Sequence, residues 1–336
     1  MNDYCLSLLE QYDIEVLRTR KGRGAYIIDT PQGPLIFKEY VGPESRAAVQ
    51  NRLLKQIQEA GVVTVEQLLP TREETFLVKD VDETGYILKT YPEGRELNIS
   101  DREECLEAVR LLGRLHQSMI LTEIPTSVQG DDDEAVIPQD RYLSSQQKRY
   151  EKGCKELRRV RKYLLQRSQK TDFELSLLHH YGYFQEQADR VCKEWTDYSR
   201  LQEPDPGVFC HGDYQYHNIL FSNQGMVVVN FEKFVADHQI RDLYLLLRKL
   251  LEKSSWSLSL GQELIAAYEQ ICPMSALSRI DLYYRLAYPE KFRKIVNFYY
   301  NSGKAWIPGR NQEKLDKIVE QEKNKQYFLE KVFQVI

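Results

Sequence analysis

The feature that most constrains this chain is a polar loop held between two short apolar runs, within residues 208–221. The loop has the pattern His-Gly-Asp-x-x-x-x-Asn and runs from His211 to Asn218. It therefore presents a carboxylate, Asp213, and five residues later an amide oxygen, Asn218. A turn follows the second apolar run, and residues 226–232 then predict another short strand. The stretch predicts a strand, a loop and two strands inside an otherwise helical region.

The spacing of these two side chains matches the needs of kinase-type phosphoryl transfer. A carboxylate receives the proton of the acceptor hydroxyl, and an amide oxygen at the other end of the loop holds Mg²⁺. The kinase catalytic loop has the same His-x-Asp-x-x-x-x-Asn spacing, and that template is the basis of this interpretation. Because Asp213 already provides the base, we predict that His211 braces the loop.

Residues 15–91 have a different pattern, in which Gly and Pro clusters separate short apolar runs. The pattern predicts three strands within 15–40, a helix over 44–60 that Gly61 ends, and two strands at 75–81 and 85–91. Beyond a hinge at Pro92-Glu93-Gly94 the chain is mainly helical, with an acidic loop at 122–140. At about 150 residues per domain, the 336 residues predict two lobes, 1–92 and 93–336.

Composition excludes several classes of protein. The 46 Lys and Arg against 50 Asp and Glu give a net charge of −4, which argues against a general nucleic-acid binder. No apolar run approaches the ~18 residues that cross a bilayer, and the N-terminus resembles no signal peptide. We therefore expect synthesis in the cytosol and no membrane contact. The six Cys have no paired spacing, which predicts free thiols.

Several motifs together resemble the aminoglycoside and choline kinase-like phosphotransferases. They are the loop at 211–218, the segment Leu112–His116 and the lone Lys38 on the third predicted strand. Further motifs resemble the CotS-type spore coat proteins of endospore formers, a group within that superfamily. These are Cys210–Ile219, Asn230–Lys233, Asp242–Lys249, Tyr288–Phe292, Asn297–Tyr300 and Lys304–Pro308. The resemblance covers about residues 15–330.

The resemblance implies an α+β, bilobal protein-kinase-like fold, with a small antiparallel-sheet N-lobe and a mainly helical C-lobe. The resemblance also implies a role for each matching position. Lys38 would bind the ATP phosphates, and Lys89–Tyr91 would form the adenine hinge, with Thr90 and Tyr91 in contact with the cofactor. Asp213 would be the catalytic base, Asn218 a metal ligand, and Asp242 a residue that braces the loop. ATP and Mg²⁺ are the implied cofactors of an active enzyme, and an inactive protein needs none. The implied location is the spore coat, among other coat proteins.

Asn230 departs from the pattern of a working kinase. An active kinase has an Asp here that holds Mg²⁺, and Mg²⁺ is usually bound through carboxylates. If residues 226–232 form a strand, residues 230 and 232 point to the same face, and Glu232 could supply the missing carboxylate. Two interpretations stay open, a metal site of Asn218, Asn230 and Glu232, and a degraded site.

Two other features are open at this stage. Gly22 and Gly24 lack the third glycine of a phosphate-binding loop, and a tight hairpin turn explains them equally well. The helix over 44–60 has no Glu in its middle that could pair with Lys38. Glu44 and Glu59, at its two ends, are the candidates for that partner.

Two functions follow from these observations. The first is an ATP-dependent phosphotransferase that acts on a hydroxyl or sugar acceptor through Asp213. The second is a pseudokinase that serves as a structural or assembly component of the coat during sporulation. Segment 148–170, with ten Lys or Arg against two Glu, is either a docking surface for an acidic partner or a solvated helix face.

Overall fold

The computed structural model describes residues 3–22, 24–119, 141–200, 208–223, 225–301 and 309–334 of the 336-residue chain. The predicted loop at 122–140 and Arg23 of the glycine turn lie outside the described residues. The chain divides into two compact units. The first unit comprises residues 1–136, 208–246 and 267–273, and the helical unit comprises 137–207, 247–266 and 274–336.

The division into units differs from the predicted lobes 1–92 and 93–336. The reason is a direct sheet connection between the N-terminal part and the loop region. Strand β10 (Gly225–Val228) pairs in parallel with β4 (Thr64–Val65), with Val227 opposite Thr64 and Val228 opposite Val65. The loop at 211–218 therefore belongs to the same unit as the N-terminal sheet.

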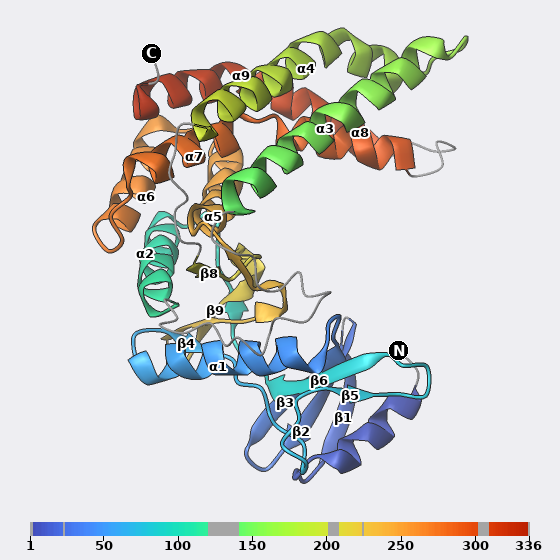
Figure 1. The fold of residues 1–336 in the computed structure, drawn as a ribbon, viewed down its shortest axis with the longest axis vertical. Coiled ribbons are helices and arrows are strands. Elements are labelled where there is room, and N and C mark those ends of the chain that lie inside the picture. The colour runs from blue at the N-terminus through green and yellow to red at the C-terminus, as the bar shows by residue number, and fades with distance from the viewer. Residues whose placement is uncertain are drawn as a thin grey trace. The chain divides into compact units, whose positions relative to one another are not determined.

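A five-stranded antiparallel sheet forms the N-terminal part of the first unit (Figure 1). Its strands, in spatial order, are β1 (Arg18–Gly22), β2 (Ala25–Thr30), β3 (Gly33–Glu39), β6 (Gly85–Thr90) and β5 (Val78–Lys79). The three strands predicted within 15–40 are confirmed. Strand β5 is shorter than predicted because the N–H groups of Phe76 and Leu77 donate to the Glu44 carboxylate, at 2.9 and 2.7 Å, and not to a strand.

The two faces of this sheet differ in burial. One face packs on the 3-10 helix η1 (Asp3–Gln11). The buried side chains of this core are Leu9, Tyr12, Tyr26, Ile28, Leu35, Phe37, Val78, Tyr86 and Leu88. The register places Lys89 opposite Ile36 and Lys38 opposite Ile87. Since side chains alternate along a strand, Lys38 and Lys89 share the other face.

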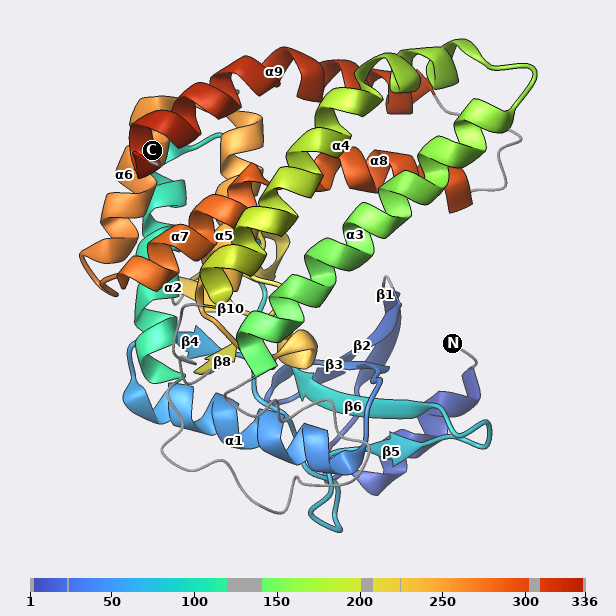
Figure 2. The same ribbon diagram turned by 45° about the horizontal axis from the view of Figure 1, so that its top comes forward.

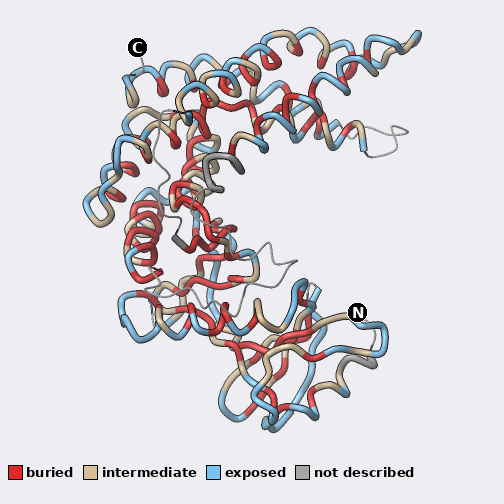
Figure 3. The backbone as a smooth tube through the Cα atoms, in the orientation of Figure 1, coloured by how far each residue is buried: buried red, intermediate tan, exposed pale blue. Residues whose placement is uncertain are grey.

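Two smaller sheets and two helices complete the first unit. One sheet has the order β4-β10-β9-β7, with β9 at Ile219–Ser222 and β7 at Arg95–Glu96, and the other pairs β8 (Val208–Cys210) with β11 (Val235–Asp237). Short 3-10 helices are η3 (Tyr216–Asn218) and η4 (Phe231–Lys233). Helix α1 (Glu44–Ala60) ends at Gly61 as predicted, at φ +66°. Helix α2 (Arg102–Ser118), capped by Asp101, carries many of the buried residues in Figure 3.

The helical unit contains most of the remaining helices. They are α3 (Arg141–Gln166), α4 (Asp172–Ser199), α7 (Ala276–Ala287), α8 (Glu290–Asn301), α9 (Gly309–Phe333), the end of α5 (Ile240–Lys253) and most of α6 (Leu258–Glu269), whose residues 267–269 belong to the first unit. Helices α3 and α4 lie side by side (Figure 2). None of the described helices is long and apolar enough to cross a membrane. The cysteines at 105, 154, 192, 210 and 272 form no disulfide, as predicted.

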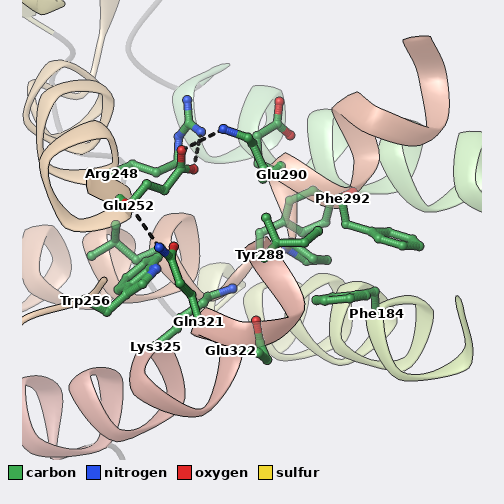
Figure 4. Close-up of a pocket in the computed structure, with 14 residues that line it drawn as sticks. Phe184, Arg248, Glu252, Trp256, Tyr288, Glu290, Phe292, Gln321, Glu322 and Lys325 are labelled. Carbon is green, nitrogen blue, oxygen red and sulfur yellow. Dashed lines mark hydrogen bonds and ion pairs between the residues drawn. The ribbon is translucent and has the colours of Figure 1, made fainter. Parts of the chain in front are cut away.

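A pocket in the helical unit is lined by the Tyr288–Phe292 motif together with side chains of α4, α5 and α9 (Figure 4). Its polar groups bind one another. Glu252 accepts from Arg248 at 2.8 Å and from Lys291 at 2.9 Å, and Gln321 donates to the Glu252 backbone oxygen at 3.1 Å. These contacts join α5, α8 and α9, so the motif has a structural role here.

Candidate functional site

The loop at 211–218 is anchored by the carboxylate of Asp242, near the start of α5. The N–H of His211 donates to Oδ2 at 2.6 Å, and the N–H of Gly212 donates to Oδ1 at 2.9 Å. Asp242 is fully buried, so its charge strengthens both bonds without competition from water. Gly212 has a φ of +79°, and a Cβ there would lie 1.9 Å from the backbone oxygen of Lys233. The turn therefore requires glycine.

His211 links this loop to the end of β10. Its Nε2 donates to the backbone oxygen of Val229 at 2.9 Å, and its Nδ1 accepts the N–H of Asp213 at 3.1 Å. These two contacts require one tautomer, with the proton on Nε2. His211 is buried and both of its nitrogens are used, which is the arrangement that a bracing residue needs.

Asp213, the predicted base, is engaged through both carboxylate oxygens. Oδ2 lies 2.8 Å from the Lys233 ammonium, and Oδ1 accepts from Gln215 at 2.5 Å. Burial raises the pKa of Asp213, but the hydrogen bonds from Lys233 and Gln215 outweigh burial and lower it. A carboxylate with a lowered pKa is a weaker proton acceptor. Lys233 must move away before Asp213 can act as a base.

Asn218 and Asn230 bind each other. Asn218 donates from Nδ2 to the backbone oxygen of Asp213 at 2.8 Å, and its Oδ1 accepts from Nδ2 of Asn230 at 2.9 Å. The Oδ1 of Asn230 accepts from the ammonium of Lys89 at 3.1 Å. Because an ammonium can only donate, Lys89 fixes the orientation of the Asn230 amide.

The prediction that residues 226–232 form one strand is wrong. Strand β10 ends at Val228, and Asn230 turns the chain with a φ of +67° into η4. The N–H groups of Asn230 and Phe231 donate to the two oxygens of Glu66, at 2.8 and 3.0 Å. They bind a carboxylate and not a neighbouring strand. Glu232 reaches the site through this turn and not through strand alternation.

Lys89 lies at the centre of the site. Its ammonium is 2.5 Å from Oε1 of Glu232, 2.8 Å from Oε2 of Glu66 and 3.1 Å from Oδ1 of Asn230. The side chains of Lys89 and Glu66 are each 1% exposed. The three N–H donors of the ammonium thus have one acceptor each.

Lys38 approaches the same oxygens from the neighbouring strand. Its ammonium lies 3.2 Å from Oε1 of Glu232 and 3.5 Å from Oδ1 of Asn230. The partner of Lys38 that the sequence left open is therefore Glu232. Glu44 instead binds the N–H groups of residues 76 and 77, and Glu59 is exposed.

The charges in this cluster stabilise one another. Burial lowers the pKa of Lys89, but Glu66 and Glu232 outweigh burial and raise it. Burial raises the pKa of Glu232, but Lys89 and Lys38 outweigh it and lower the pKa to about 2. Lys89 and Glu232 are therefore both ionised at neutral pH.

The three predicted metal ligands lie together, but their oxygens already accept hydrogen bonds. Asn218 accepts from Asn230, Asn230 accepts from Lys89, and Oε1 of Glu232 faces both lysines. Among the described residues, no group of three or more His, Cys, Asp or Glu side chains could hold a metal ion. In this arrangement the residues do not fit Mg²⁺.

The predicted adenine hinge has its backbone donors in use. The N–H of Thr90 donates to the backbone oxygen of Gln67 at 2.8 Å, and the N–H of Tyr91 donates to that of Pro34 at 3.0 Å. Pro92 has no N–H. Residues 90–92 therefore have no free N–H for a base. The side chain of Lys89 enters the buried ion cluster.

The glycine turn between β1 and β2 is a tight hairpin. Gly22 pairs with Ala25 at the end of the ladder, and Gly24 has a φ of +71°. Arg20 forms an ion pair with Asp29 on β2 at 3.0 Å.

Three groups of the site were not expected from the sequence: Glu66, the side chain of Lys89, and Lys233. For Glu66 and Lys89 a local signal existed. Each follows a short apolar run, Val62–Val65 or Tyr86–Leu88, and a charged residue beside such a run is a candidate for a buried ion pair. The exposed Lys233 offered no such signal.

Solved structures of antibiotic kinases are similar to this chain. An aminoglycoside phosphotransferase from Alicyclobacillus acidocaldarius has a TM-score of 0.77 at 16% identity, over 97% of this chain and 94% of that one. Spectinomycin phosphotransferase APH(9)-Ia, with ADP and spectinomycin, has a TM-score of 0.61 at 13% identity, over 99% and 98%. Amicoumacin kinase hAmiN, with AMP-PNP, Ca²⁺ and Ami, has a TM-score of 0.59 at 11% identity, over 98% and 94%. The predicted kinase-like fold is confirmed.

No curated protein matches the sequence. The predicted resemblance to kinase-like spore coat proteins is confirmed by a family model. That model, described as "Spore coat putative kinase YutH", matches residues 6–332, and the chain belongs to this family.

Proposed function

We propose that this chain is a kinase-like component of the spore coat that acts in coat assembly and does not transfer phosphate. The observation that carries the proposal is the set of contacts of Asn230. Its Oδ1 faces Lys89 and its Nδ2 faces Asn218. An active kinase has a carboxylate here that holds Mg²⁺, whereas this side chain is neutral and bonded on both sides.

The state of the loop supports the same proposal. Asp213 is paired with Lys233 at 2.8 Å, which opposes uptake of a proton. The hinge offers no N–H from residues 90–92 to a nucleotide base. These features act on three separate needs of a kinase: the metal, the base and nucleotide recognition.

We expect the purified chain to consume no ATP above the rate of a protein-free control, in Mg²⁺ or in Mn²⁺. The measurement is phosphate release and self-phosphorylation with labelled ATP. Wild type, Asn230→Asp and Asp213→Asn are compared, because loss of a catalytic base lowers a rate by about 10²–10⁴. Metal-dependent turnover by wild type that Asp213→Asn abolishes would refute the proposal.

A second candidate function is phosphoryl transfer to a hydroxyl or sugar acceptor. The observation that favours it is the intact spacing of Asp213 and Asn218, with Asn218 bonded to the backbone of Asp213 at 2.8 Å. Structural neighbours of this chain were crystallised with ADP, or with AMP-PNP and Ca²⁺. ATP with a divalent cation would then be the cofactors of this chain.

A basic stripe on α3 supports an assembly role with other coat proteins as partners. The stripe is Lys148, Lys152, Lys155 and Arg159, which repeat every three to four residues and so share one helix face. With Glu151 and Glu156 these residues line a hollow. Within the described part of the chain, no acidic side chain forms an ion pair with the stripe. Glu156 is bound by Arg293 instead, at 2.6 Å. The stripe fits an acidic partner.

Reversing two charges of this stripe should release the protein from the coat. We expect Lys152→Glu/Lys155→Glu to reduce coat-bound fluorescence of a tagged protein about tenfold, a loss of about 1.4 kcal/mol in binding. The matched control is Lys314→Glu/Lys323→Glu on exposed positions of α9. Equal deposition of both variants would indicate that the stripe is only a solvated helix face.

A further inference from the structure

We propose that the ammonium of Lys89 takes the place of a metal ion, so that the kinase-like site is a cation site filled by the chain itself. This inference deepens the proposed function and rests on it, because it says what keeps the site from transferring phosphate.

The oxygens around Lys89 are of the kinds that hard cations prefer. Two are carboxylate oxygens, from Glu66 at 2.8 Å and Glu232 at 2.5 Å, and one is the amide oxygen of Asn230 at 3.1 Å. They come from two segments: Glu66 lies next to β4, and Asn230 and Glu232 lie in the turn that follows β10 and begins η4. An ammonium has three donors, and each oxygen takes one of them.

The surroundings hold this arrangement in place. Glu66 accepts the N–H groups of Asn230 and Phe231, which fixes the turn that carries Asn230 and Glu232. Lys89 and Glu66 are each 1% exposed, so water cannot replace either partner. A buried charge that loses its partner is strongly unfavourable. The ammonium of Lys89 therefore stays paired with Glu66 inside the cluster.

Charge balance in the cluster opposes a second cation. Lys38 and Lys89 bring two positive charges, and Glu66 and Glu232 bring two negative charges. A divalent ion would enter a neutral cluster and meet two ammonium groups. Removing the charge of Lys89 leaves one excess negative charge. Oε2 of Glu66 then has no ammonium, and Oε1 of Glu232 and Oδ1 of Asn230 keep only that of Lys38, at 3.2 and 3.5 Å. An ion from solution could then take that position.

The test is thermal unfolding without nucleotide in three buffers, which contain EDTA, Mg²⁺ or Mn²⁺. Wild type should show the same Tm in all three buffers. Lys89→Met and Lys89→Gln should have a lower Tm in EDTA and should gain about 3 °C or more from Mn²⁺. The matched control is Lys38→Met, which removes a lysine from the same sheet face but leaves Lys89 in place. We expect it to gain nothing from Mn²⁺.

Each outcome decides the inference. It is supported if only the Lys89 variants gain stability from Mn²⁺, or if they fold only when Mn²⁺ is present. It is overturned if the Tm of wild type rises with Mn²⁺ as much as that of the variants, or if the Tm of the folded variants does not rise. It is also overturned if the Lys89 variants fold in none of the three buffers. If the Mn²⁺ experiment overturns the inference and wild type does not turn over ATP, the proposed function still stands. ATP turnover by wild type refutes the proposed function itself.

Discussion

Asp242→Asn is expected to lower the free energy of unfolding of the first unit by about 3 kcal/mol. The carboxylate is fully buried and accepts two backbone N–H groups, from His211 and Gly212. An Asn side chain has one oxygen and one NH₂ group, so one of these N–H groups would face a donor. An unsatisfied buried N–H costs about 1–3 kcal/mol. The charge that strengthens the other bond is lost as well.

The neighbouring His116 does not compensate for this loss. Its Nδ1 lies 2.8 Å from the Tyr268 hydroxyl, and its Nε2 lies 3.5 Å from Oδ2 of Asp242. Burial lowers the pKa of His116 despite the nearby carboxylate, so the ring is neutral at pH 7. The carboxylate of Asp242 therefore depends on the two backbone N–H groups.

Urea unfolding followed by circular dichroism measures the effect of Asp242→Asn. The control is Asp29→Asn, which removes an exposed ion pair with Arg20 and should cost less than about 1 kcal/mol. Equal losses in the two variants would show that Asp242 does not anchor the loop.

Local rules predicted the first three strands and the first long helix of the first unit. The alternation of apolar runs with Gly and Pro predicted β1, β2 and β3, because such residues end strands in any context. The apolar period of residues 44–60 and the stop at Gly61 predicted α1 to the residue. Both signals act within a few residues of the chain, so they need no knowledge of tertiary contacts.

The ion cluster could not be predicted in this way. Glu66 binds Lys89 across 23 positions and Asn230 across 164. Lys89 was predicted as part of a hinge. Its side chain lies on the same sheet face as Lys38 because the strand register sets Lys89 opposite Ile36, and the sequence does not specify that register. Asn230 was identified from the sequence because it departs from the kinase motif. Its amide contacts with Lys89 and Asn218 could not be predicted, because they depend on how other segments of the chain fold. The ion cluster therefore depends on strand register and on contacts between distant residues, which local sequence rules do not predict.

Acid should destabilise the first unit through Glu232. Lys89 and Lys38 lower the pKa of this carboxyl to about 2, against the effect of burial. A group whose pKa is lower in the folded state stabilises the fold above its unfolded pKa, near 4.3, and loses that contribution as the pH falls toward 2. The shift corresponds to about 3 kcal/mol at neutral pH. We expect the unfolding free energy to fall by about this amount between pH 5 and 2.

The measurement is urea unfolding of wild type and Glu232→Gln from pH 2 to 7. The difference between the two should be largest above pH 5 and should shrink toward pH 2, because protonation makes wild-type Glu232 neutral as well. The control, Glu83→Gln, removes an exposed ion pair with Lys79 and should differ little from wild type at any pH. A constant difference across this range would contradict the pairing of Glu232 with the two lysines.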